Sequence, residues 1–201
     1  MSDPHDAAPA GRGHPWLRPA LVVGPIVLIA VILVVLSLTR APADVFVATP
    51  DGRASPADSS GFRILTVDGT DPVRWRFLSL EQGRALETPG AGDWDMAVRR
   101  FHIIANGGVA FAGRGGLVDL GEVPVDSASA PARGYLPTTA DSVNPAIERW
   151  YRYGLTSHLL TPLPKSYAFR TATGRTGVLA IVGYYCPGPT PGCVTIRYRL
   201  D

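Results

Sequence analysis

An uncharged, apolar stretch at residues 19–39 strongly limits what the N-terminal part of this chain can form. It runs for 21 residues, PALVVGPIVLIAVILVVLSLT, between Arg18 and Arg40. A helix rises about 1.5 Å per residue, so a helix of this length spans the roughly 30 Å hydrocarbon layer of a bilayer. The stretch is apolar on all sides, whereas a helix on a soluble core has a polar stripe. We therefore predict a transmembrane helix over residues 19–39.

This helix divides the chain into four parts. Residues 1–18 are polar and rich in Pro and Gly, which predicts a short cytoplasmic tail before the membrane segment. Residues 40–61 contain turn-forming and small polar residues, and we interpret them as a linker that includes a candidate first strand. Residues 62–201 are long enough for one ordinary domain with a single core.

The orientation of the helix is not set by charge, because two arginines lie near each end of it. The two cysteines decide instead. Cys186 and Cys193 bracket a six-residue loop, CPGPTPGC, between two strand-like runs, where a hairpin can bring the sulfur atoms into bonding distance. A disulfide there requires an oxidising compartment, whereas two free thiols do not. The disulfide predicts a cytoplasmic N-terminus and an extracytoplasmic domain on a single-pass helix.

Export with loss of the helix is the alternative. Ala41, Pro42 and Ala43 place small residues at the two positions that a signal peptidase reads. The apolar run is longer than the core of about 7 to 15 residues that is typical of a signal peptide, which favours the anchor.

The remaining sequence has the period of two that indicates strands. Residues 73–79 alternate apolar and arginine side chains, and residues 94–105 are rich in β-branched and aromatic residues, so we predict a strand over each. The glycine-rich residues 107–121 predict an irregular strand or loop packed close to other backbone. Residues 122–145 lack periodicity and predict a long surface loop. Three further runs predict an antiparallel meander with a buried central strand: residues 167–172, 178–185 and 194–200.

Composition and motifs exclude several function classes. The 19 basic and 17 acidic residues form no block of like charge, which argues against a nucleic-acid partner. The chain lacks the Gly-x-Ser-x-Gly, Walker and His-Glu-x-x-His motifs, so we predict that it is not an enzyme. Asp93 and Asp95 lack the further ligands of a calcium loop and are interpreted as solvated or turn-capping carboxylates.

Two histidines of the predicted β domain are candidate ligands of a metal or of haem iron. His102 lies in an apolar run, RFHII, where a hydrogen-bonded structural histidine is the alternative. His158 lies in a predicted loop, YGLTSHLLTP, whose apolar and aromatic neighbours could cover a flat macrocycle. No other metal site is predicted.

Four segments, in this order, resemble the HmuY-like family. Residues 92–101, GDWDMAVRRF, lead into Ala-Asn-Gly-Gly at 105–108 and resemble the family's central motif. The others are WRFLSLEQGRAL before it, YAFRTATGRTGVLAIVGYY after it, and the terminal VTIRYRL. The likeness extends over roughly residues 73–200.

The resemblance implies an all-β fold of antiparallel sheets. The studied members of the family capture haem with two axial histidines at the bacterial surface, and the resemblance implies a similar role here. His158 and His102 are the candidates in this chain, although neither is placed by a matching motif. We expect a membrane-anchored, extracytoplasmic binding module with haem as candidate cofactor. The alternative is a structural or protein-interaction ectodomain of the same fold without a haem site, whose protein partner the sequence does not identify.

Overall fold

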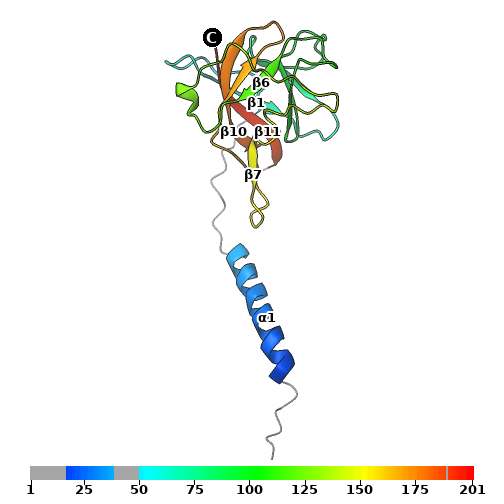
Figure 1. The fold of residues 1–201 in the computed structure, drawn as a ribbon, viewed down its shortest axis with the longest axis vertical. Coiled ribbons are helices and arrows are strands. Elements are labelled where there is room, and N and C mark those ends of the chain that lie inside the picture. Colours follow the sequence, from blue (N-terminus) through cyan, green and yellow to red (C-terminus); the bar gives the residue numbers. More distant parts are fainter. Residues whose placement is uncertain (1–16, 39–49, 189) are drawn as a thin grey trace, which may run out of the picture. The chain divides into compact units, whose positions relative to one another are not determined.

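The computed structural model describes residues 17–38, 50–188 and 190–201 (Figure 1). The chain divides into two compact units, Met1–Pro42 and Ala43–Asp201.

The described part of the first unit is one helix, α1 (Leu17–Leu38). Within the ranges that the structure describes, no helix combines the length and the apolarity needed to cross a membrane. The transmembrane prediction for residues 19–39 is therefore not supported. Residues 1–16 of the predicted tail and residues 40–49 of the predicted linker lie outside the described residues.

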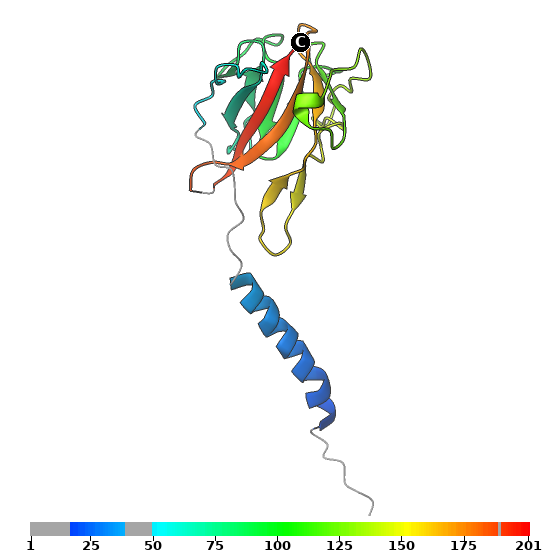
Figure 2. The same cartoon turned by 90° about the vertical axis from the view of Figure 1, so that its left-hand side faces the viewer.

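The second unit is built from antiparallel sheets, as predicted (Figure 2). A five-stranded sheet has the order β1-β11-β10-β9-β6, and a four-stranded sheet has the order β3-β2-β4-β5. The strands of the first are β1 (Arg63–Asp68), β6 (Gly116–Asp119), β9 (Tyr167–Arg170), β10 (Thr176–Tyr185) and β11 (Pro191–Leu200). The strands of the second are β2 (Arg76–Ser79), β3 (Arg84–Leu86), β4 (Met96–Arg99) and β5 (His102–Ala105).

A separate two-stranded hairpin, β7 (Tyr151–Tyr153) and β8 (Leu160–Pro162), extends beyond the two sheets (Figure 2). The predicted loop over residues 122–145 is present. The structure describes in it one short 3-10 helix, η1 (Val125–Ser127), and an isolated β-bridge between Leu136 and Leu117.

The core lies between the two sheets. Alternate residues of β11, namely Val194, Ile196 and Tyr198, pack in one cluster with Leu78 of β2 and Met96 of β4. Full burial of an aliphatic side chain of this size contributes about 1.5–3 kcal/mol, so this interface provides much of the stability. The central strand of the C-terminal meander, β10, lies between β9 and β11, as predicted.

The predicted single strand over residues 94–105 is wrong. The chain reverses there, and β4 and β5 pair as a hairpin in which Arg99 lies opposite His102. Arg100 has a φ of 54°, a conformation that allows a two-residue turn and that glycine normally supplies. The composition of the segment correctly indicates strand residues. The turn itself contains none of the residues that usually mark a turn, such as Gly, Asn, Asp or Pro.

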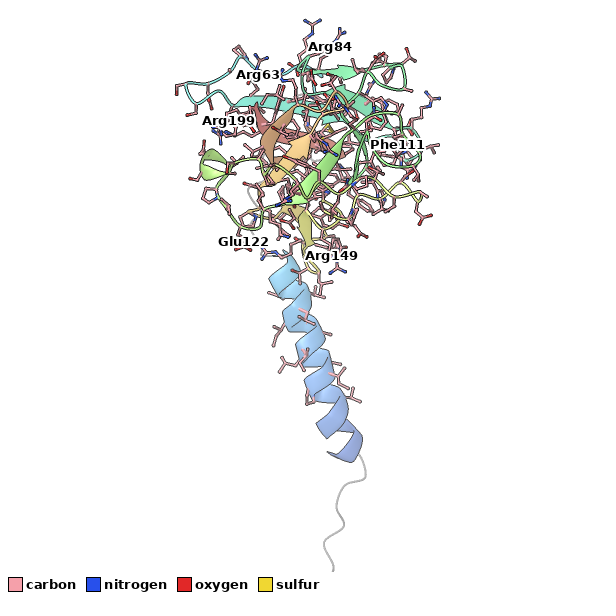
Figure 3. All side chains as sticks on the ribbon, turned by 45° about the horizontal axis from the view of Figure 1, so that its top comes forward. Arg63, Arg84, Phe111, Glu122, Arg149 and Arg199 are labelled. Carbon is pink, nitrogen blue, oxygen red and sulfur yellow. A yellow bond between two sulfur atoms is a disulfide. The ribbon has the colours of Figure 1, made fainter. Side chains whose placement is uncertain are left out.

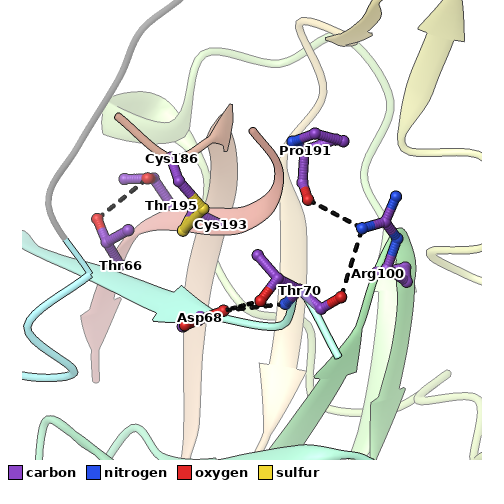
Figure 4. The surroundings of a disulfide bond; sticks show 8 residues. All are labelled: Thr66, Asp68, Thr70, Arg100, Cys186, Pro191, Cys193 and Thr195. Atoms are coloured by element: carbon purple, nitrogen blue, oxygen red, sulfur yellow. Dashed lines mark hydrogen bonds between the residues drawn. A yellow bond between two sulfur atoms is a disulfide. The ribbon is translucent and has the colours of Figure 1, made fainter. Parts of the chain in front are cut away.

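Cys186 and Cys193 form the predicted disulfide (Figure 4). The bridge joins the residue after β10 to a residue near the start of β11, and both cysteines are buried. Cys193 also lies opposite Asp68 in the pairing of β11 with β1. The disulfide therefore closes one end of the long β10–β11 hairpin.

Candidate functional site

An open pocket lies at the base of the β7–β8 hairpin. Its volume is about 340 Å³, within the range of small-molecule sites. We call it the aromatic pocket, and its lining residues are Arg100, Phe101, Tyr151, Tyr153, His158, Leu160, Tyr184, Tyr185 and Pro191. Phe101 is 37% and Tyr153 is 47% exposed, so a ligand can reach both rings.

The β4–β5 turn is fixed against the hairpin by Trp150, which is buried directly before β7. Its indole Nε1 donates a hydrogen bond to the carbonyl oxygen of Phe101 at 2.8 Å. The ring of Phe101 then meets that of Tyr151 edge to face, with centroids 5.7 Å apart. Trp150 also packs edge to face on Tyr184 at 5.5 Å. These contacts hold aromatic rings from three elements around one space.

A second link attaches the hairpin to the five-stranded sheet. The backbone N–H of Leu160 donates to the hydroxyl oxygen of Tyr185 at 2.8 Å. Tyr184 and Tyr185 end β10 immediately before Cys186, and Pro191 begins β11 just before Cys193. The disulfide thus holds together the two strand ends that form one wall of the pocket.

His158 lies in the loop of the hairpin and lines the aromatic pocket, as a ligand residue would. Its Nδ1 lies 2.6 Å from the hydroxyl oxygen of Tyr153. The loop is closed by backbone bonds from His158 N–H to the Gly154 carbonyl and from Gly154 N–H to the Leu159 carbonyl, both 2.8 Å. In the tautomer that donates from Nδ1 to Tyr153, the lone pair of Nε2 is available to a metal ion.

His102 lies in an adjoining pocket of about 250 Å³. Partial burial, together with the positive charge of Arg99, lowers the pKa of His102 and favours its neutral imidazole. Its ring packs against that of Phe101, with the centroids 4.3 Å apart and the ring planes tilted by 34°. Phe101 and Tyr151 line both pockets. The two candidate histidines are therefore on adjoining pockets with a shared wall, and the structure does not bring them together in one pocket.

Polar residues also line this second pocket. They are Ser142, Asn144, Glu148 and Arg149, and the last is labelled in Figure 3. Glu148 acts on His102 by favouring its charged form, against the effects of burial and Arg99.

Backbone strain is concentrated at these two pockets. In the described part of the chain, three residues other than glycine have a positive φ: Arg100 at 54°, Ser142 at 58° and His158 at 54°. Arg100 and His158 line the aromatic pocket and Ser142 lines its neighbour. Such conformations cost about 1–3 kcal/mol each and gather at binding sites.

Comparison with solved structures identifies the architecture. A Bacteroides vulgatus protein assigned as HmuY-like and haem-binding aligns with a TM-score of 0.56 and 18% identity, over 74% of this chain and 97% of that protein. The apo HmuY analogue of Tannerella forsythia aligns with a TM-score of 0.54 and 16% identity, over 70% and 95%. The β domain has an HmuY-like fold.

A Bacteroides fragilis protein assigned as a lipoprotein also aligns, with a TM-score of 0.56 and 16% identity, over 75% of this chain and 96% of that protein. No family model matches the sequence, and no curated protein is similar enough to count as a relative. The identities are low, so these likenesses establish the fold of the HmuY-like domain and leave its ligand to be argued from the pocket.

Sequence reasoning singled out His102 and His158 as candidate ligands. It did not single out three residues that line the aromatic pocket, Arg100, Phe101 and Tyr184. In the sequence, Phe101 and Tyr184 lie in apolar runs and resemble ordinary core residues. The reversal of the chain between β4 and β5 places the Phe101 side chain at the surface. Met96, whose thioether is another group that can ligate haem iron, is 1% exposed in the core and lines neither pocket. Among the described residues, no group of three His, Cys, Asp or Glu side chains could hold a metal ion.

Proposed function

We propose that the HmuY-like domain is a non-enzymatic binding module that takes haem in the aromatic pocket, with His158 as the iron ligand. The pairing of His158 Nδ1 with the hydroxyl of Tyr153 is the observation that carries this proposal. Histidines that ligate metals characteristically use the second ring nitrogen in such a hydrogen bond, which fixes the ring and its tautomer. The likeness to an HmuY analogue and to a protein assigned as haem-binding adds support.

The lining residues fit an iron porphyrin in kind. Tyr151, Phe101 and Leu160 offer apolar and aromatic surface to a flat macrocycle. When bound, haem supplies an iron centre that accepts an imidazole nitrogen. His102 belongs to the adjoining pocket, so we propose that His158 acts without it.

A hemin titration of the full chain tests this proposal. We expect a shift of the Soret band for the wild type, and a loss of affinity of about tenfold or more for His158→Ala, equivalent to about 1.4 kcal/mol. Tyr153→Phe, which removes the orienting hydroxyl, should weaken binding less. His102→Ala is the matched control and should leave the affinity unchanged.

Two results would contradict the haem proposal. A wild-type chain without a Soret shift would favour a structural or interaction domain of the same fold. Equal affinities for wild type and His158→Ala would remove His158 from the site.

We also infer that the β domain functions outside the cytoplasm. Disulfides persist in oxidising compartments, and the Cys186–Cys193 bridge is part of the fold. The uncharged, apolar run at residues 19–39 supports export of the chain, either with cleavage of the run or with its retention.

Mass spectrometry of the protein from its native host, with and without reductant, tests this location. We expect a mass that includes one disulfide in a membrane or exported fraction. A mass that retains residues 19–39 identifies an anchor, and a mass that lacks them identifies a signal peptide. Free thiols in a cytosolic fraction would contradict the inference.

A further inference from the structure

Arg100 is a half-buried cation in the wall of the aromatic pocket, and its hydrogen bonds use only part of its guanidinium (Figure 4). Its Nη1 donates to the carbonyl oxygen of Pro191 at 3.2 Å and to that of Thr70 at 3.4 Å. A guanidinium has further N–H donors on Nε and Nη2. Within the described residues, those donors have no hydrogen-bond acceptor.

Arg100 also has no acidic partner in the described part of the chain. The ion pairs there involve Arg74, Arg76, Lys165 and Arg197 with aspartate or glutamate. A partly desolvated charge without a counter-ion is unfavourable, because the carbonyl dipoles of Pro191 and Thr70 replace water only in part. An anion bound in the pocket would remove this penalty.

The backbone of Arg100 adds a second cost at the same position. With φ at 54°, it occupies a turn position for which glycine is favoured. An arginine there is strained relative to the extended or right-handed helical conformations that it normally adopts. The surrounding structure holds it, since its N–H donates to the Gly69 carbonyl at 2.6 Å. Local rules are broken in this way mainly at functional sites.

We propose that Arg100 is the specificity-determining residue of the aromatic pocket and that it recognises a carboxylate on the ligand. The Nε and Nη2 donors form a fork that matches the two oxygens of a carboxylate. The hydrogen bonds from Nη1 to the carbonyl oxygens of Pro191 and Thr70 orient the guanidinium and leave this fork unpaired within the described residues. The inference rests on the proposed function, because it names the polar group of the same planar ligand.

The test compares three porphyrins on the full chain: hemin, hemin dimethyl ester and iron-free protoporphyrin IX. Both acids retain carboxylates, whereas the ester caps them. We expect the wild type to bind hemin about tenfold or more tightly than the ester, equivalent to about 1.4 kcal/mol. Arg100→Gln keeps an amide donor for the carbonyls and removes the charge. It should lower the affinity for hemin to that of the ester and leave the affinity for the ester unchanged.

Arg99→Gln is the matched control. Arg99 precedes Arg100 but stacks on Trp75, 4.4 Å from the ring centroid, and does not line the pocket. It should preserve the preference for hemin. Urea unfolding of both variants shows whether each folds as stably as the wild type. If Arg100 had a structural role alone, its substitution would lower the affinities for the acids and for the ester equally.

The outcomes separate this inference from the haem proposal. Equal affinities of the wild type for hemin and its ester would overturn the role of Arg100 and leave the haem site in place. Binding of protoporphyrin IX that depends on Arg100 would support the role of Arg100 independently of iron. Hemin binding that depends on Arg100 but is unchanged in His158→Ala would support Arg100 and overturn the His158 assignment. A wild type that binds none of the three porphyrins would overturn both.

Discussion

Gly107→Ala is expected to destabilise the β domain by about 3 kcal/mol, near the upper end for overpacking a close contact. A Cβ atom at Gly107 would overlap the backbone of Gly115, including its carbonyl oxygen. Neither side can yield easily, because the Gly115 N–H donates to the Asn106 carbonyl at 2.7 Å. The Asn106 side chain in turn donates to the carbonyl of Trp94 at 2.7 Å and accepts from Gly113 at 3.1 Å. An alanine would therefore disturb a buried hydrogen-bond network as well as one contact.

Urea unfolding measures this effect, with the free energy extrapolated from a common slope. Gly92→Ala is the matched control, since an added Cβ there meets nothing within 4 Å. Its effect should stay within about 0.5 kcal/mol. Equal destabilisation by both substitutions would contradict the close packing around Asn106.

Asp95→Ala is expected to destabilise the domain by about 3 kcal/mol or more, because it leaves buried N–H groups without acceptors. The carboxylate is 3% exposed. It accepts the backbone N–H of Leu80 at 2.7 Å on one oxygen and that of Ala172 at 2.9 Å on the other. Leu80 follows β2 and Ala172 follows β9, so Asp95 links the two sheets. Each orphaned donor costs about 1–3 kcal/mol.

Asp95→Asn should have a smaller effect of about 1–3 kcal/mol, since one oxygen is kept and the other becomes an NH₂ group that faces a donor. Asp93→Asn is the control at an exposed position and should change the stability by no more than about 0.5 kcal/mol. The same urea measurement applies. If Asp95→Asn matched Asp93→Asn, the carboxylate would have no role in joining the sheets.

The sheets could be predicted because their signals are local. β10 and β11 alternate or stay apolar over long runs, and the loop between Cys186 and Cys193 has a hairpin's length. The glycine-rich segment after Asn106 was expected to pack against backbone, and Gly107 does so. These features depend on residues that are neighbours in the chain.

The features that could not be predicted depend on distant partners. Asp95 was interpreted as solvated or turn-capping, and solvation was wrong because burial follows from the contact with Ala172, 77 residues away. Arg100 could not be singled out from the sequence, because its hydrogen-bond partners, Thr70 and Pro191, lie 30 and 91 residues away. His158 was a candidate from its apolar and aromatic neighbours, but its pairing with Tyr153 depends on the register of the β7–β8 hairpin.

A crystal structure of the full chain with hemin tests the central claim most directly. The account predicts that hemin occupies the aromatic pocket, with its iron bonded to His158 Nε2, the Tyr153 hydroxyl still paired with Nδ1, and a carboxylate on Arg100. Hemin bound at another surface, or iron held by other residues, would contradict it.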